Sequence, residues 1–168
     1  ATREMVRKIN DVSLSNIVRA SLLVQFSTMP SRVSVETAQI YLQDESPLLR
    51  SAAVRSLQSL PVQDRFRILT PYLDDDSQIV RFELAEALID LYPLLPEVNR
   101  SKIKILIDEY RRSLVLSHDS PATQLTVANL EARLGNQTEA ENALSQALII
   151  EQNYVPALLN LADYYRGV

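Results

Sequence analysis

The amino-acid sequence predicts an all-α protein, a right-handed superhelix in which pairs of helices stack into a solenoid. A helical pattern recurs with a period of 31 residues, at 15–29, 46–60 and 77–91. A fixed period of this size with helical apolar spacing is the mark of stacked repeats. The chain also has only two glycines, whereas all-β folds need many glycine-containing turns.

The repeated segments place residues of the same kind in register. The sets that follow the 31-residue step are Arg19, Arg50 and Arg81; Ile17, Leu48 and Ile79; and Phe26, Leu57 and Leu88. Because one helical pair cannot bury its apolar face alone, we expect neighbouring pairs to share one continuous core.

Proline and serine mark the helices of the first half. Pro30 ends the first repeat helix, Ser31 is an expected N-cap, and Ser46-Pro47 begins the next helix before Pro61 ends it. The helices expected here are the end of one within 1–13, then 15–28, 31–43, 46–60, 64–73 and 77–92. The last of these follows an acidic cap at 74–77, which favours a helix N-terminus.

The second half changes its period to 34 residues, as the paired segments Ala128-Asn129-Leu130 and Ala162-Asp163-Tyr164 indicate. Gly135-Asn136 is typical of a helix C-terminus. The helices expected here are 97–117, 121–134, 137–150 and 154–166. We therefore predict two blocks, 1–95 and 96–168, packed as one solenoid.

Composition excludes several classes of function. A net charge of −4 gives no basic surface for nucleic acid and no polybasic membrane patch. The absence of cysteine excludes disulfides, cysteine-bound zinc and a thiol nucleophile. No apolar run approaches the ~20 residues of a membrane span. We expect no membrane insertion, and the compartment, periplasmic or cytoplasmic, stays open. The chain starts without Met and stops within a motif, so we expect a fragment of a longer protein.

The first block resembles HEAT repeats. The matching residues are Asp44, Leu49-Arg50, Ala52-Ala53 and Leu57 in one repeat, and Asp75, Val80-Arg81, Ala85 and Leu88 in the next. The resemblance implies that Arg50 and Arg81 pair with carboxylates such as Asp44 and Asp75 in a ladder between repeats. A binding surface for an acidic partner is the alternative for these arginines.

The second block resembles tetratricopeptide repeats. The matching residues are Val127, Ala128, Gly135, Ala140, Leu144 and Ala147, followed by Leu158, Leu161, Ala162 and Tyr165. In the peptide-clamping members of that family, asparagines on the first helices of the repeats bind the ligand through their amides. The resemblance therefore gives these peptide-groove candidates: Asn129, Arg133, Asn160, Asp163 and Arg166. Surface polarity is the alternative explanation of the asparagines.

The sequence favours a non-catalytic scaffold that binds a protein or peptide on its concave surface, or docks another domain of its own longer chain. It contains no Ser/His/Asp set, no HExxH and no glycine-rich phosphate loop, and we expect neither enzyme activity nor a cofactor or metal. The single histidine, His118, and the Asp74–Asp76 cluster are interpreted as structural, because both lie at helix ends.

A second function is kept as an alternative. Fused HEAT and tetratricopeptide blocks also resemble the C-terminal region of some bacterial multihaem c-type cytochrome proteins. The segment would then be a structural or regulatory arm of a larger redox enzyme. It contains no CxxCH motif, so haem would attach elsewhere in such a protein.

Overall fold

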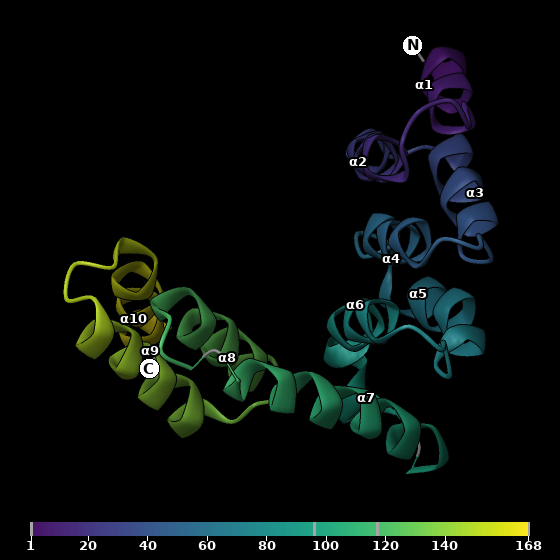
Figure 1. Ribbon diagram of the computed structural model, residues 1–168. Helices are drawn as coiled ribbons and strands as arrows, with labels where there is room; N and C mark the ends of the chain where they lie inside the picture. The colour runs from purple at the N-terminus through teal and green to yellow at the C-terminus, as the bar shows by residue number, and fades with distance from the viewer. Residues whose placement is uncertain (1, 96, 117, 168) are drawn as a thin grey trace.

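A computed structural model describes residues 2–95, 97–116 and 118–167, and all regular structure within them is helical (Figure 1). The prediction of an all-α chain is confirmed. The helices are α1 (Thr2–Ile9), α2 (Asn16–Ser27), α3 (Arg32–Tyr41), α4 (Pro47–Ser56), α5 (Val62–Leu69), η1 (Thr70–Tyr72), α6 (Gln78–Leu88), η2 (Ile89–Leu94), α7 (Glu97–Val115), α8 (Pro121–Arg133), α9 (Gln137–Ile150) and α10 (Val155–Gly167), where η denotes a 3-10 helix.

The predicted starts of the helices are largely confirmed. Ser31 accepts a hydrogen bond from the Ser34 N–H, and Ser34 in return accepts one from the Ser31 N–H, which closes a capping box at the start of α3. Pro47 occupies the first turn of α4, where its missing N–H costs no hydrogen bond. At the end of α8, Gly135 has a φ of 83°, which side-chain-bearing residues rarely adopt.

Three predicted helix ends were wrong by several residues. The helix expected over 46–60 ends as an α-helix at Ser56, and the one expected over 77–92 ends at Leu88. The second continues as the tighter η2, which contains Pro93. A 3-10 helix bonds across three residues rather than four, so it can satisfy backbone groups near a proline. The helix expected over 64–73 ends as an α-helix at Leu69, and Pro71 lies in the 3-10 helix η1 that follows it.

The helices form two limbs that enclose an open angle (Figure 1). In the first limb, α2, α4 and α6 follow one another on the side that faces this angle, and α3 and α5 lie behind them. α4 packs between α2 and α6, and α7 packs on α6 and leads to the second limb of α8, α9 and α10. The side of α2, α4 and α6 that faces the angle is hereafter the concave side.

The core explains the 31-residue register. Phe26, Leu57 and Leu88 are each at most 1% exposed, so the same helix position is buried in each repeat. The described buried residues fall into two clusters. The first extends from Ile9 through α7 to Leu130 of α8, and the second joins α8, α9 and α10. The first cluster is therefore continuous across residue 95, the predicted boundary between two blocks that share a core, because α7 packs on α6 and η2.

None of the described helices combines the length and the apolar character that a bilayer crossing requires.

Candidate binding groove

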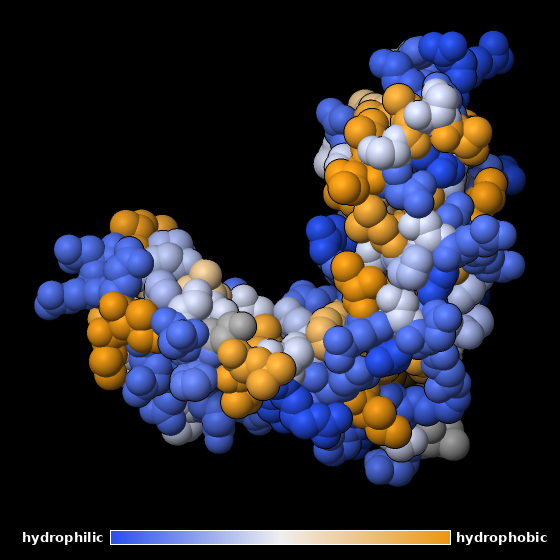
Figure 2. All heavy atoms as spheres, in the orientation of Figure 1, coloured by the Kyte–Doolittle hydropathy of each residue, from blue (hydrophilic) through white to orange (hydrophobic). Residues whose placement is uncertain are grey.

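The concave side carries a groove that crosses α2, α4 and α6. One cavity of about 560 Å³ is lined by residues of all three helices, and a second of about 440 Å³ continues over α6 to Tyr110 of α7. Arg55 and Ile79 line both cavities, so the two adjoin. Figure 2 shows hydrophobic atoms grouped along this side of the first limb.

The floor of the groove repeats with the same 31-residue step as the helices. The positions that line it near the helix N-termini form an aliphatic row: Ile17, Leu48 and Ile79. Ile17 is 69% exposed and Ile79 is 46% exposed, while Leu48 is half-buried. Single exposed aliphatic residues are common on protein surfaces, whereas three that line one cavity form an apolar patch of the kind that marks interaction sites.

The groove is polar toward the C-terminal ends of α4 and α6, opposite the aliphatic row. Arg55 of α4 donates to both carboxylate oxygens of the buried Glu83 on α6. Tyr110 of α7 donates to Glu86 over 2.5 Å, and burial together with this bond raises the pKa of Tyr110. The hydroxyl donates and the Glu86 carboxylate accepts, so these side chains serve as fixed hydrogen-bonding groups.

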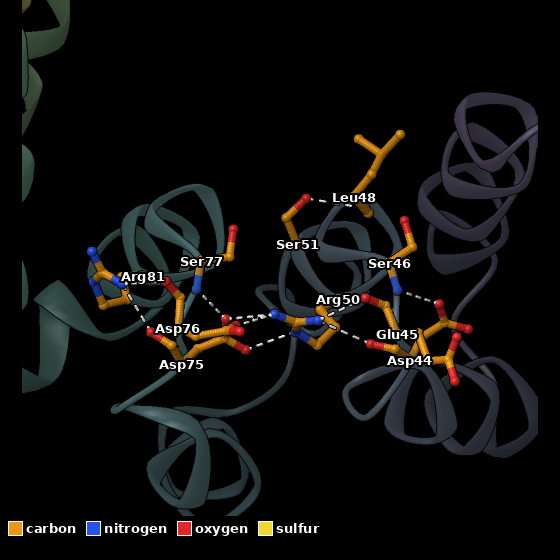
Figure 3. A network of polar contacts seen from close by, with 10 residues as sticks. All are labelled: Asp44, Glu45, Ser46, Leu48, Arg50, Ser51, Asp75, Asp76, Ser77 and Arg81. Atoms are coloured by element: carbon orange, nitrogen blue, oxygen red, sulfur yellow. Dashed lines mark hydrogen bonds and ion pairs between the residues drawn. The ribbon is translucent and has the colours of Figure 1, made fainter.

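The side of α4 away from the groove holds the arginine ladder (Figure 3). Arg50 donates two hydrogen bonds of 2.8 Å to the carboxylate of Asp75 and a third to Asp76. Leu48 and Ser51 point away from this ladder in Figure 3. The same helix thus uses one side for ion pairs between repeats and the other side for the groove.

The expected pairing of the ladder needs one correction. The carboxylate of Asp44 does not pair with an arginine; it accepts the Ser46 N–H over 2.9 Å, and only its backbone carbonyl binds Arg50. The Asp75 carboxylate accepts the equivalent bond from the Ser77 N–H through Oδ1. Its second oxygen, Oδ2, accepts a hydrogen bond from Arg50 Nε. Arg50 therefore reaches forward to the carboxylate of the next repeat.

The ladder continues beyond the repeats that suggested it. Arg81 donates to both oxygens of Glu109 on α7, over 2.8 and 2.6 Å, and also to the carbonyls of Asp75 and Asp76. Arg19, at the other end, binds the Ile9 carbonyl and the Tyr41 hydroxyl instead of a carboxylate. The arginine register is thus structural at all three positions.

The groove expected in the second block lies between α8, α9 and α10. Asn160 donates to Asn129 over 3.1 Å, and both line a cavity of about 330 Å³ together with Asp163. The structure therefore brings the two asparagines together, but each already occupies part of the other's hydrogen-bonding capacity.

Arg133 was wrongly placed in this groove. Its guanidinium faces the first limb, where it binds Asp90 over 2.7 Å and the Glu86 carbonyl over 2.8 Å. Arg166 is exposed and pairs with Asp163 over 3.2 Å on its own helix. Arg133 therefore does not supply the cation that a clamp for a ligand's carboxylate would need beside the two asparagines.

The remaining candidates have structural roles. His118 Nδ1 lies 2.9 Å from the Val115 carbonyl at the end of α7, as expected of a residue at a helix C-terminus. No group of three or more His, Cys, Asp or Glu side chains that could hold a metal occurs in the parts of the chain that the structure describes.

Comparison of the chain with known protein families, with curated proteins and with solved structures finds no match.

The sequence predicts binding on a concave surface, but it does not identify the residues of α2, α4 and α6 that line this groove. The aliphatic row was visible as a periodic set, but periodicity alone does not distinguish a covered apolar position from an exposed one. A usable signal is that the row precedes the fully buried position by nine residues, as Ile17 precedes Phe26. Nine residues correspond to 2.5 turns of an α-helix, so the two side chains lie on opposite faces.

Proposed function

We propose that the chain is a non-catalytic helical-repeat scaffold that binds a segment of another protein in the concave groove of α2, α4 and α6. In this proposal the helices form a right-handed superhelix of HEAT-like pairs over 1–95 and tetratricopeptide-like pairs over 96–168. The single observation that carries the function is the aliphatic row, Ile17, Leu48 and Ile79, which lines one cavity and is partly exposed there.

The energetics favour a ligand at this place. A concave apolar surface with a few fixed polar groups is the usual form of a recognition site, because each square ångström of apolar area removed from water contributes roughly 25 cal/mol. The ion pairs behind the groove, such as Arg50 with Asp75, fix the spacing of its helices. A groove formed in advance loses little conformational entropy when a ligand binds.

The polar end of the groove supports binding rather than catalysis. Within the described residues, Glu83 is engaged by Arg55, and Glu86 by Tyr110. Carboxylates held in this way orient a ligand, but none is paired with a nucleophile or placed as an available proton acceptor.

A selection from a random peptide library tests the proposal. The intact chain, immobilised, is exposed to displayed peptides in parallel with the variants Ile79→Glu and Ile40→Glu. Ile40 lies on α3 and is 72% exposed, so it is a matched control away from the groove. We expect enriched peptides that bind the chain and the control variant and lose binding to Ile79→Glu. Peptides that bind all three proteins equally, or no enrichment at all, would contradict the proposal.

A further inference from the structure

Helix α10 is apolar on two opposite sides. One side packs on α9 through the buried Ala157 and through Leu161. The other side carries an exposed stripe with the helical spacing i, i+3, i+4 and i+7, hereafter the α10 stripe: Val155, Leu158, Leu159 and Ala162. Val155 is 60% exposed, Leu158 43% and Leu159 59%. A helix that is apolar all round is normally buried all round, so the α10 stripe is a candidate docking surface.

Helix α8 is an internal counterpart of α10. Both helices are 13 residues long and they begin 34 residues apart, at Pro121 and Val155. This step relates Leu159 to Leu125 and Ala162 to Ala128. On α8 the two equivalent side chains belong to the core cluster shared with α9, in which Ala128 is 2% exposed. The α10 stripe therefore occupies the position at which α8 is covered by a neighbouring helix.

Helix α9 shows which kind of helix covers such a surface. Its buried face consists of small residues and one leucine, again at the spacing i, i+3, i+4 and i+7: Ala140, Ala143, Leu144 and Ala147. Alanines on one helix let the backbone of the other approach closely, and a leucine fills the groove between its side chains. We propose that the α10 stripe binds an amphipathic α-helix of a partner protein, whose bound face carries alanines and a leucine at the spacing found in α9.

The chemistry of the α10 stripe favours a helix over an extended segment. All four of its side chains are aliphatic and offer no hydrogen bond. An extended segment laid on it would withdraw backbone N–H and C=O groups from water without gaining partners for them. An α-helix pairs these groups internally and presents only side chains, with anchors at i, i+3, i+4 and i+7.

A second copy of the chain does not offer the required face. The alanines of α9 are already buried within its own chain, in the cluster that α9 forms with α8 and α10. At the edge of the α10 stripe, Arg166 pairs with Asp163 over 3.2 Å, so this edge carries no net charge that would select a charged partner. The bound helix is therefore expected to come from another protein and to bind through apolar burial.

A peptide with the sequence of α9 tests the proposal by fluorescence anisotropy, because α9 covers the equivalent surface of α8. The peptide covers residues 137–150 with capped ends. A lactam-bridged Glu/Lys pair replaces Asn142 and Gln146, which are exposed on α9, because a free helix of this length is marginal in water. The control peptide carries the same bridge together with Ala143→Glu and Ala147→Glu. We expect the intact protein to bind the α9 peptide at least about tenfold more tightly than the control.

Variants of the intact protein assign the binding to the α10 stripe. Leu159→Glu and Val155→Glu should each weaken binding of the α9 peptide by about tenfold or more, because the bound helix would bury an unpaired carboxylate. Both side chains are exposed, so the fold does not depend on them, and circular dichroism checks this. Ile79→Glu in the concave groove and Ile40→Glu on α3 should leave the affinity unchanged. The inference is therefore measured separately from the proposed function.

Three results would overturn the inference. The first is that the α9 peptide does not bind, or binds no better than its control. The second is that it binds without dependence on Leu159 and Val155, which would indicate exchange with α9 on α8 or binding elsewhere. The third comes from sedimentation velocity of the protein alone at increasing concentration, where we expect a monomer. A dimer that Leu159→Glu dissociates would show that a second copy covers the α10 stripe instead of a partner helix.

Discussion

The guanidinium of Arg50 on α4 binds the carboxylate of Asp75 before α6 through two hydrogen bonds of 2.8 Å, across 25 residues of sequence. Their side chains are 12% and 7% exposed, so the pair is largely withdrawn from water. Removal of one partner of such a pair leaves the other charge unsatisfied, and this costs more than the pair contributes when intact. The ladder therefore fixes how consecutive repeats stack.

Asp75→Asn is expected to lower the free energy of unfolding by about 2–4 kcal/mol, because it leaves Arg50 with only the exposed Asp76 as a carboxylate partner. Urea denaturation followed by circular dichroism measures the effect. Asp74→Asn is the matched control: Asp74 is 81% exposed and pairs with Lys102 at the surface, so we expect a change below about 1 kcal/mol. Equal effects of the two substitutions would contradict a structural ladder.

Stability should fall on acidification through the ladder carboxyls. Burial opposes ionisation of Asp75, but the hydrogen bonds from Arg50 and Ser77 outweigh it and hold the pKa of Asp75 below its usual 3.8. A hydrogen bond from Arg81 likewise lowers the pKa of Glu109 below its usual 4.5. Folded pKa values below the unfolded ones mean that the stabilisation is present above about pH 4.5 and is lost as the pH falls through the folded pKa values.

Urea titrations from neutral pH down to about pH 3 measure this dependence. Asp75→Asn should flatten the acid limb, because the substituted residue no longer releases a proton on folding. The same slope in the variant and the parent chain would show that other groups determine the acid sensitivity.

The junction of the two limbs depends on a second ion pair. Arg111 of α7 donates to both oxygens of Glu131 on α8, over 2.7 and 3.0 Å, and Glu131 is 7% exposed. Arg111→Leu should destabilise the docking of α8 by about 1–2 kcal/mol, since Arg111 itself is partly exposed and Asn136 still donates to Glu131. Limited proteolysis between α7 and α8 should accelerate in this variant and not in the exposed neighbour Arg112→Leu. An unchanged cleavage rate would show that Arg111 does not stabilise the junction.

The groove suggested by the tetratricopeptide resemblance can be separated from the concave groove. In the double variant Asn129→Ala/Asn160→Ala, the mutual amide contact is lost at an exposed site, so stability should change by less than about 1 kcal/mol. A peptide selected on the intact chain should retain its affinity in isothermal titration. A tenfold loss in this variant would instead place the binding site on α8 and α10.

The positions of the helices could be predicted, because their starts and ends depend on local residues such as Ser31, Pro47 and Gly135. The burial of Phe26, Leu57 and Leu88 could also be predicted, because the 31-residue register places all three on the same face of their helices. The partner of Arg133 could not be predicted, because Asp90 lies 43 residues upstream and the contact depends on how the limbs dock. The exposure of Ile17 and Ile79 depends on which elements lie opposite them, and this information is absent from a helical pattern.

Isoleucine methyl spectra provide the most direct measurement of the central proposal, that the concave groove binds a protein segment. The intact chain, labelled at its isoleucine δ1 methyl groups, is titrated with a peptide selected on it. We expect Ile17 and Ile79 to shift with the peptide, and Ile40 on α3 and Ile149 on α9 to remain in place. Shifts confined to Ile149, or a binding peptide that leaves Ile17 and Ile79 unmoved, would contradict the proposal.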